Sequence, residues 1–168
     1  YNGHIEIIKL LLKNGVNVHK EDDWAFRWAS EHGHFEIAQL LLNNNANIHV
    51  RNDISLQSAS NNGHLAVVQL LLTKDANIHA NNNYALRSAS ENGHLEVVRL
   101  LIDMGANIHA KTNYALRLAS KNGHIAVVQL LLEKGNNIYA RNDDALHAAV
   151  ETKHLEIVQL LKEYIHKN

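Results

Sequence analysis

The sequence has no cysteine and no proline among its 168 residues, and aromatic side chains make up only 5% of it. Without cysteine the chain forms no disulfide and no thiolate site, which excludes cysteine-based catalysis. No apolar run approaches the roughly 20 residues of a membrane-spanning helix, and no signal-like segment opens the chain. The formal charge of −1 gives no electrostatic reason to expect nucleic acid or an anionic membrane. We therefore expect a soluble, cytoplasmic protein.

What the chain has in abundance is internal repetition. The segment 83–110, NYALRSASENGHLEVVRLLIDMGANIHA, returns nearly unchanged at 113–140. A fixed period between about 20 and 50 residues indicates stacked units, none of which can bury its apolar face alone. We therefore expect one solenoid domain over residues 1–168. The pairs that mark its 30-residue period are Gly3-His4, Gly33-His34, Gly63-His64, Gly93-His94 and Gly123-His124, followed by Lys153-His154.

The units divide the chain unevenly at its two ends. Residues 1–20 form a partial unit without a first helix, so Ile5, Ile8 and Leu12 are expected to lack part of their cover, as in a fragment of a longer array. In the last unit Lys162 replaces an apolar residue and Lys153 replaces the turn glycine, which is typical of a C-terminal cap. The complete units are 21–50, 51–80, 81–110 and 111–140, and the capping unit is 141–168.

The residue pattern within each unit predicts two helices and a connector. The first helix is expected to start at an Asp or Asn, whose side-chain oxygen accepts a free helical N–H, and to run for about eight residues. The second helix, such as HLEVVRLLID at 94–103, has a broad apolar face and is expected to be mostly buried. The expected starting residues are Asp23, Asp53, Asn83, Asn113 and Asp143.

The second helix ends at residue types that tolerate a left-handed conformation. The positions are Gly15, Asn45, Asp75, Gly105 and Gly135. A connector of the ANIHA type follows, and its aliphatic residue is expected to be buried against the helices. These buried residues are Val18, Ile48, Ile78, Ile108 and Ile138.

The run through NGHLEVV, LL and Ala-Asn-Ile resembles the ankyrin repeat, whose usual form carries TPLHLAA, GHxEIVxxLL and GADVNA. The resemblance covers essentially the whole chain and implies an all-α ankyrin-repeat solenoid of stacked helix-turn-helix units. Tyr84-Ala85-Leu86-Arg87 stands where the family has Thr-Pro-Leu-His, and the unit is shorter than the usual length of about 33 residues. Because the deletion falls in the finger, we expect short loops in place of full β-hairpin fingers. Such 30-residue units are similar to those of ankyrin proteins of mimivirus-like giant viruses.

Thirteen histidines raise the possibility of a metal site. Packed helices stand about 8–10 Å apart, whereas ligands of one zinc ion lie about 2.0–2.1 Å from it, so successive histidines of a series cannot share an ion. We expect the Gly-His series to make helix-start and turn hydrogen bonds. Surface metal at His32 and His34 and a pH switch are alternatives. No metal or cofactor is expected, and no catalytic motif is present, so we expect no enzyme.

Two further series have one residue in each unit. Ser30, Ser60, Ser90 and Ser120 are expected to pack between helices. The second histidine series is expected to make local connector hydrogen bonds. In the ankyrin family an asparagine at this place can be hydroxylated, which is the alternative role for the aligned residues His19, His49, His79, His109 and Tyr139.

The units differ most on their first helices and tips, which the resemblance places on the concave face where ankyrin proteins bind partners. An aromatic residue stands three positions before an arginine in three units, so each pair shares one side of a helix. Tryptophan, tyrosine and arginine are also the most frequent interface hot spots. The predicted partner-binding residues are Trp24, Arg27, Trp28, Tyr84, Arg87, Tyr114, Arg117, Asn82 and Thr112. In the alternative, the aromatics pack between units and the arginines bond to tip carbonyls.

These features favour a non-catalytic, monomeric scaffold that binds a protein partner and no small-molecule substrate. If the viral resemblance holds, the scaffold engages host or viral proteins in the host-cell cytoplasm. Nucleic-acid binding through the arginines and tyrosines is a second hypothesis, opposed by the net charge of −1. A structural spacer within a longer ankyrin array is the third.

The predicted helix ends have a testable consequence for stability. Asn45→Gly and Asp75→Gly should each raise the free energy of unfolding by up to about 1 kcal/mol, because glycine adopts the left-handed conformation without a Cβ clash. Thermal melts of the two variants measure the change. A lower melting temperature in both would contradict the assigned helix ends.

Overall fold

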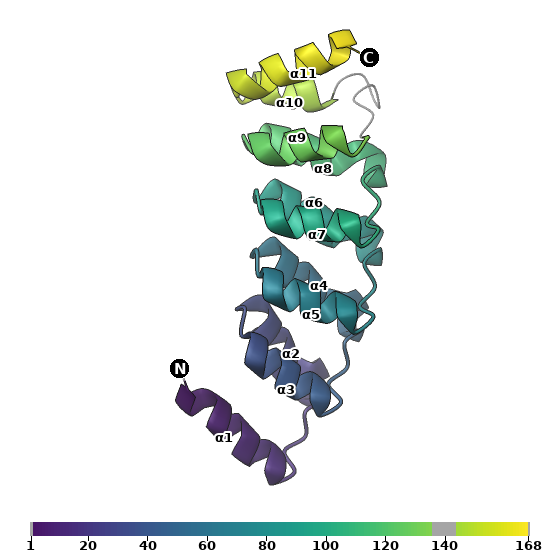
Figure 1. The fold of residues 1–168 in the computed structure, drawn as a ribbon. Coiled ribbons are helices and arrows are strands. Elements are labelled where there is room, and N and C mark those ends of the chain that lie inside the picture. The colour runs from purple at the N-terminus through teal and green to yellow at the C-terminus, as the bar shows by residue number, and fades with distance from the viewer. Residues whose placement is uncertain (1, 136–143, 168) are drawn as a thin grey trace.

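The computed structural model describes residues 2–135 and 144–167, which form eleven helices and no strand. Figure 1 shows the helices stacked in pairs, with the connectors along one edge of the stack. The all-α solenoid expected from the sequence is thus confirmed. The helices are α1 (Asn2–Lys13), α2 (Lys20–Glu31), α3 (Phe35–Asn43), α4 (Val50–Asn61), α5 (Leu65–Thr73), α6 (Ala80–Glu91), α7 (Leu95–Asp103), α8 (Ala110–Lys121), α9 (Ile125–Glu133), α10 (Asp144–Glu151) and α11 (Leu155–Lys167).

The even-numbered helices α2 to α10 form one layer and the odd-numbered helices form the other (Figure 1). Neighbours in the even-numbered layer pack against one another more extensively than neighbours in the other layer. A stack with one closer layer curves toward that layer, so the even-numbered helices line its inner side. The core between the layers repeats a buried leucine or phenylalanine in nine of the eleven described helices: Phe26, Leu56, Leu86 and Leu116 from the even-numbered layer, and Leu41, Leu71, Leu101, Leu131 and Leu161 from the other.

A left-handed turn replaces the hairpin finger. At the start of α2, α4, α6 and α8, three successive residues have φ between 49° and 60°. The right-handed part of each helix begins directly afterwards, as the sequence predicts. A left-handed conformation costs residues other than glycine roughly 1–2 kcal/mol each, and Asn and Asp tolerate it best. Eight of the twelve turn residues are accordingly Asn or Asp: Asp22, Asp23, Asn52, Asp53, Asn81, Asn82, Asn83 and Asn113.

The ends of the second helices also follow the prediction. Asn45 has φ of 66° and Asp75 has φ of 64°, and the three glycines of the series are left-handed too. Among the connector residues, Ile48 is buried and Val18, Ile78 and Ile108 are partly buried against the core. The predictions for Ile138, Tyr139 and Asp143 lie outside the described residues.

The backbone of the Gly-His series makes the expected helix-start and turn hydrogen bonds, whereas its side chains join neighbouring units. His64 makes no side-chain bond to its own helix start. Its Nε2 donates instead to the carbonyl of Glu31 in the preceding pair at 2.9 Å, because its ring lies directly over Gly33. A Cβ at Gly33 would lie only 2.5 Å from Nδ1 of this ring. Equivalent bonds run from His94 to Asn61 and from His124 to Glu91.

Helix α1 has much apolar surface exposed. Ile7 is 58% exposed and Leu10 is 60% exposed, while Ile5, Ile8 and Leu12 are half-buried, in line with the expected partial cover. Among the described helices α1 packs mainly against α3. No helix in the described ranges has both the length and the apolar character needed to cross a bilayer.

Substitutions at two glycines distinguish the cost of backbone strain from the cost of losing the histidine contact. Gly63 (φ 75°) meets the His94 ring, whereas Gly105 (φ 96°) has no atom within 4 Å of the position of a Cβ. Gly105→Ala should cost about 1 kcal/mol of unfolding free energy, the left-handed penalty alone. Gly63→Ala should cost about 2–4 kcal/mol, because it also displaces the ring and its hydrogen bond. Urea denaturation measures both, and equal losses would show that the ring contact contributes nothing.

Candidate functional site: the first-helix face and its tips

Every predicted site residue lies on the even-numbered helices or on the left-handed turns before them. We call one side of these helices the first-helix face; it comprises residues 24, 27, 28 and 31 of α2 and their equivalents every 30 residues, and it contains both exposed and buried side chains. Trp24 is 52% exposed, Trp28 is 39% exposed and Tyr84 is 40% exposed. Tyr114 is half-buried. The face therefore presents aromatic rings on rigid helices.

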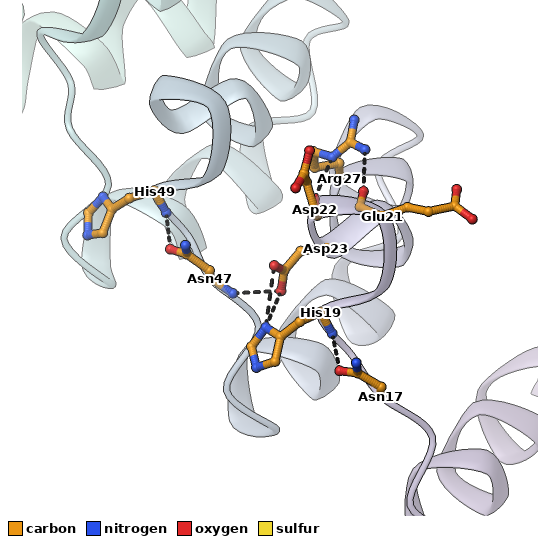
Figure 2. A network of polar contacts seen from close by, with 8 residues as sticks. All are labelled: Asn17, His19, Glu21, Asp22, Asp23, Arg27, Asn47 and His49. Carbon is orange, nitrogen blue, oxygen red and sulfur yellow. Dashed lines mark hydrogen bonds and ion pairs between the residues drawn. The ribbon is translucent and has the colours of Figure 1, made fainter.

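A buried acceptor oxygen anchors each turn beneath this face (Figure 2). Asp23 is 4% exposed, and its Oδ1 accepts a hydrogen bond from His19 Nδ1 at 3.1 Å and one from the backbone N–H of Asn47 at 2.8 Å. The latter bond crosses to the next connector. Asp53 and Asn83 make the same pair of contacts.

These contacts correct one prediction and confirm another. Asp23 does not cap its own helix, because residues 21–23 are left-handed, whereas a capping residue is typically extended. The second histidine series makes local hydrogen bonds, as expected: His109 Nδ1 lies 2.9 Å from Asn113 Oδ1, and the backbone N–H of His109 donates to Asn107 Oδ1 at 2.9 Å. Both the ring and the backbone N–H of the histidine thus hold the connector in place.

The arginines of the face hold the turns. Arg87 Nε donates to the carbonyl of Asn82 at 3.1 Å, and Nη2 donates to that of Asn81 at 2.9 Å. Arg27 makes the same two bonds, to Asp22 and Glu21. These are the tip-carbonyl contacts of the alternative interpretation. Because Arg87 is only 8% exposed, its role in the free protein is structural.

Tyrosine rings and guanidinium groups alternate along α6 and α8. Arg87 Cζ lies 5.2 Å from the ring centroid of Tyr84 and 5.5 Å from that of Tyr114. Arg117 Cζ lies 4.2 Å from the Tyr114 centroid. We call these four residues the Tyr/Arg ladder. Each exposed cation–π contact is worth about 0.5–1 kcal/mol, and more when desolvated, so the ladder joins the two helices.

Stacked rings cover the corresponding part of α2. The centroids of Trp24 and Trp28 are 6.3 Å apart, and Trp28 lies 4.4 Å from His32 and 5.0 Å from His34. From the sequence alone His32 is a metal candidate and not part of this cluster. Its spacing of four residues from Trp28 was the available signal. The described residues contain no group of three or more ligating side chains placed for a metal ion.

The face is hollowed where its aromatic and arginine pattern changes. One hollow of about 350 Å³ lies between α2, α4 and α6 and includes Ile54 and Gln57. Another, of about 270 Å³, lies between α8 and α10 and includes Asp144 and His147. None of these four residues is among the partner-binding residues predicted from the sequence. The signal was that each stands where other units carry the aromatic residue or the arginine.

The tips add polar surface beside the face. Asn82 and Thr112 are exposed at the middle position of their turns, with φ of 57° and 60°. An ion pair joins neighbouring tips, with Arg51 Nη2 2.8 Å from Asp22 Oδ2. Both side chains are more than half exposed, so this pair contributes less than about 1 kcal/mol. The serines Ser30, Ser60, Ser90 and Ser120 are fully buried between helices, as predicted.

The arginine contacts make a prediction for the turn. Arg87→Met should lower the free energy of unfolding by about 2 kcal/mol, because two turn carbonyls lose a charged donor and two rings lose their cation. Arg87→Gln should cost less, since Gln57 donates one such bond to Asn52 in α4. Arg99→Met is the control, because Arg99 is exposed and its ion pair with Glu96 is long, at 3.9 Å. If the control loses as much as Arg87→Met, the assigned role of Arg87 is wrong.

Comparison with known proteins identifies the family. A family model described as ankyrin repeats (3 copies) matches residues 1–52, 51–112 and 108–168. No curated protein sequence is similar enough to the chain to count as a match. Because the three family matches together span the chain from end to end, the protein belongs to the ankyrin repeat family.

Proposed function

We propose that the chain is a non-catalytic scaffold that binds a partner protein through the first-helix face and the adjoining tips. Ankyrin repeats are generally protein–protein interaction modules. The observation that carries the choice of face is the exposure of Trp24, Trp28 and Tyr84 on one layer of helices. Large aromatic side chains of this kind dominate interface energies.

The face suits binding because it is formed before a partner arrives. The turns are anchored by Asp23 and its equivalents, and arginines bond to their carbonyls. A preformed surface loses little conformational entropy on association. Trp24, Trp28 and Tyr84 supply the main contacts in this proposal, with Asn82 and Thr112 at the tips and Arg27, Arg87, Tyr114 and Arg117 supporting them.

The proposal extends to the organisation and setting of the chain. The units 21–50 to 111–140 form one domain with the partial unit 1–20, and residues 141–168 form its cap. Support for the cap comes from α11, where Leu161 is fully buried, Lys162 is exposed and the Tyr164 hydroxyl donates to Leu132. The likeness to mimivirus-like giant-virus units supports a monomeric viral protein that binds host or viral proteins in the host-cell cytoplasm.

Nucleic-acid binding is the weaker hypothesis because the cations it needs are engaged elsewhere. The guanidinium groups of Arg27 and Arg87 donate to turn carbonyls. Arg87 is only 8% exposed, which leaves little of its guanidinium open to a phosphate, and the chain has a net charge of −1. A steep fall of affinity with salt would favour nucleic acid over protein.

Affinity capture with matched triple variants tests the proposal. Trp24→Ala combined with Trp28→Ala and Tyr84→Ala should reduce capture of a specific partner at least about tenfold, as quantified by mass spectrometry of eluates from infected-cell lysate. The control combines Leu65→Ala, Met104→Ala and Leu155→Ala, which remove exposed apolar side chains from the other layer. Circular dichroism must first show that both variants are folded.

The outcomes separate the hypotheses. Loss of capture only in the aromatic variant supports the first-helix face. Equal capture by wild type and the aromatic variant places the interface elsewhere, and loss only in the control assigns it to the odd-numbered layer. A folded wild-type chain that captures no protein favours the spacer hypothesis.

A further inference from the structure

Helix α4 interrupts a pattern that its neighbours carry. The first right-handed position of each even-numbered helix holds Trp24, Ile54, Tyr84, Tyr114 and Asp144. Three residues later the chain has Arg27, Gln57, Arg87, Arg117 and His147. Helix α4 therefore lacks both the aromatic ring and the guanidinium, although α2 and α6 on either side of it have both.

The Tyr/Arg ladder shows what the missing guanidinium would contact. Arg87 lies over Tyr84 on its own helix and over Tyr114 on the next helix. By the same 30-residue relation, an arginine at position 57 would lie over Tyr84. Gln57 is too short for this role. It is buried, donates to the carbonyl of Asn52, and accepts a bond from Asn81 Nδ2 at 3.1 Å.

A hollow lies at this place on the face. Its volume is about 350 Å³. In α2 the indole of Trp28 occupies the position that Ser58 holds in α4, so a small side chain opens the floor of the hollow. The residues around it are Glu31, Ile54, Gln57, Ser58, Asn61, Asn62 and Tyr84.

The lining has the chemistry of a cation site. It contains one carboxylate, Glu31, no basic side chain, and the amide or hydroxyl groups of Gln57, Ser58, Asn61 and Asn62. Glu31 is exposed and forms no ion pair with the described residues. A guanidinium is planar, carries five N–H donors, is weakly hydrated and stacks on aromatic rings, whereas an ammonium ion lacks the flat face that Tyr84 would receive.

We propose that the hollow between α2, α4 and α6 binds an arginine side chain of the partner protein. The guanidinium stacks on Tyr84 and pairs with Glu31. This inference rests on the proposed function, since it names the side chain by which a partner engages the first-helix face.

A nuclear magnetic resonance titration tests the site without a known partner. The probe is N-acetyl-arginine methylamide, added to the full 15N-labelled chain. Saturable amide shifts are expected at Ser58, Asn61 and Tyr84. The citrulline analogue has the same shape without the charge and should bind at least about fivefold more weakly, because the charged bond to Glu31 and the cation–π contact are lost.

Two variants make the test specific. Gln57→Arg supplies the guanidinium from within the chain, as Arg27 and Arg87 do in their helices, and should reduce probe binding at least about tenfold. Gln69→Arg adds the same charge at an exposed position of α5 and should leave binding unchanged. Glu31→Gln, a surface change that keeps the fold, should weaken binding severalfold and provides the answer if Gln57→Arg does not fold.

The result that would overturn the inference is equal binding of the arginine and citrulline probes, or retained binding in the folded Gln57→Arg chain. Partner capture distinguishes this failure from failure of the proposed function. If a partner needs the aromatic residues of the first-helix face but binds Gln57→Arg as tightly as wild type, the arginine site is wrong and the proposed function stands. If the probe binds but the captured partner does not need the first-helix face, the arginine site stands and the proposed function is wrong.

Discussion

The architecture depends on the buried side-chain oxygen of residue 23 and on the equivalent oxygens in the other units. Such an oxygen accepts one bond from the histidine of its own connector and one from the backbone of the next connector. Because this oxygen is buried, losing the N–H of the next connector would leave a buried acceptor short of a partner, which is costly. One atom thus fixes the left-handed turn, the connector and the distance between units. The positions of Trp24, Tyr84 and the other residues of the face follow from it.

The sequence predicted the features that local chemistry determines. The period located the helices, and the Asn, Asp and Gly residues after the second helices were left-handed as expected. The tyrosine and arginine spacing correctly placed Tyr84 and Arg87 on one side of their helix, where they lie in contact. These predictions succeeded because each depends on residues within one helix or one turn.

The features it missed depend on contacts between units. The turn Asn81-Asn82-Asn83 contains no glycine, yet all three residues are left-handed. Asn83 Oδ1 accepts a hydrogen bond from the backbone N–H of Asn107, a contact with the next connector that helps offset the cost of this conformation. The direction of His64 is set by Gly33, in the preceding unit. Gln57 and Ile54 depart from the repeated pattern, and the repeated residues do not indicate the hollow that these two residues help to line. In the candidate site, the departures from the pattern created the hollow.

The contact between Gly33 and His64 also constrains how such an array can change in length. Each inner unit offers a bare backbone surface to the unit after it and extends an imidazole to the unit before it. Duplication of one whole unit preserves every donor, acceptor and glycine at the new junction. An insertion that shifts the Gly-His pair relative to its helices would place a side chain where the imidazole of the next unit lies. The array can therefore grow or shrink by recombination between near-identical units while each surviving junction keeps its geometry.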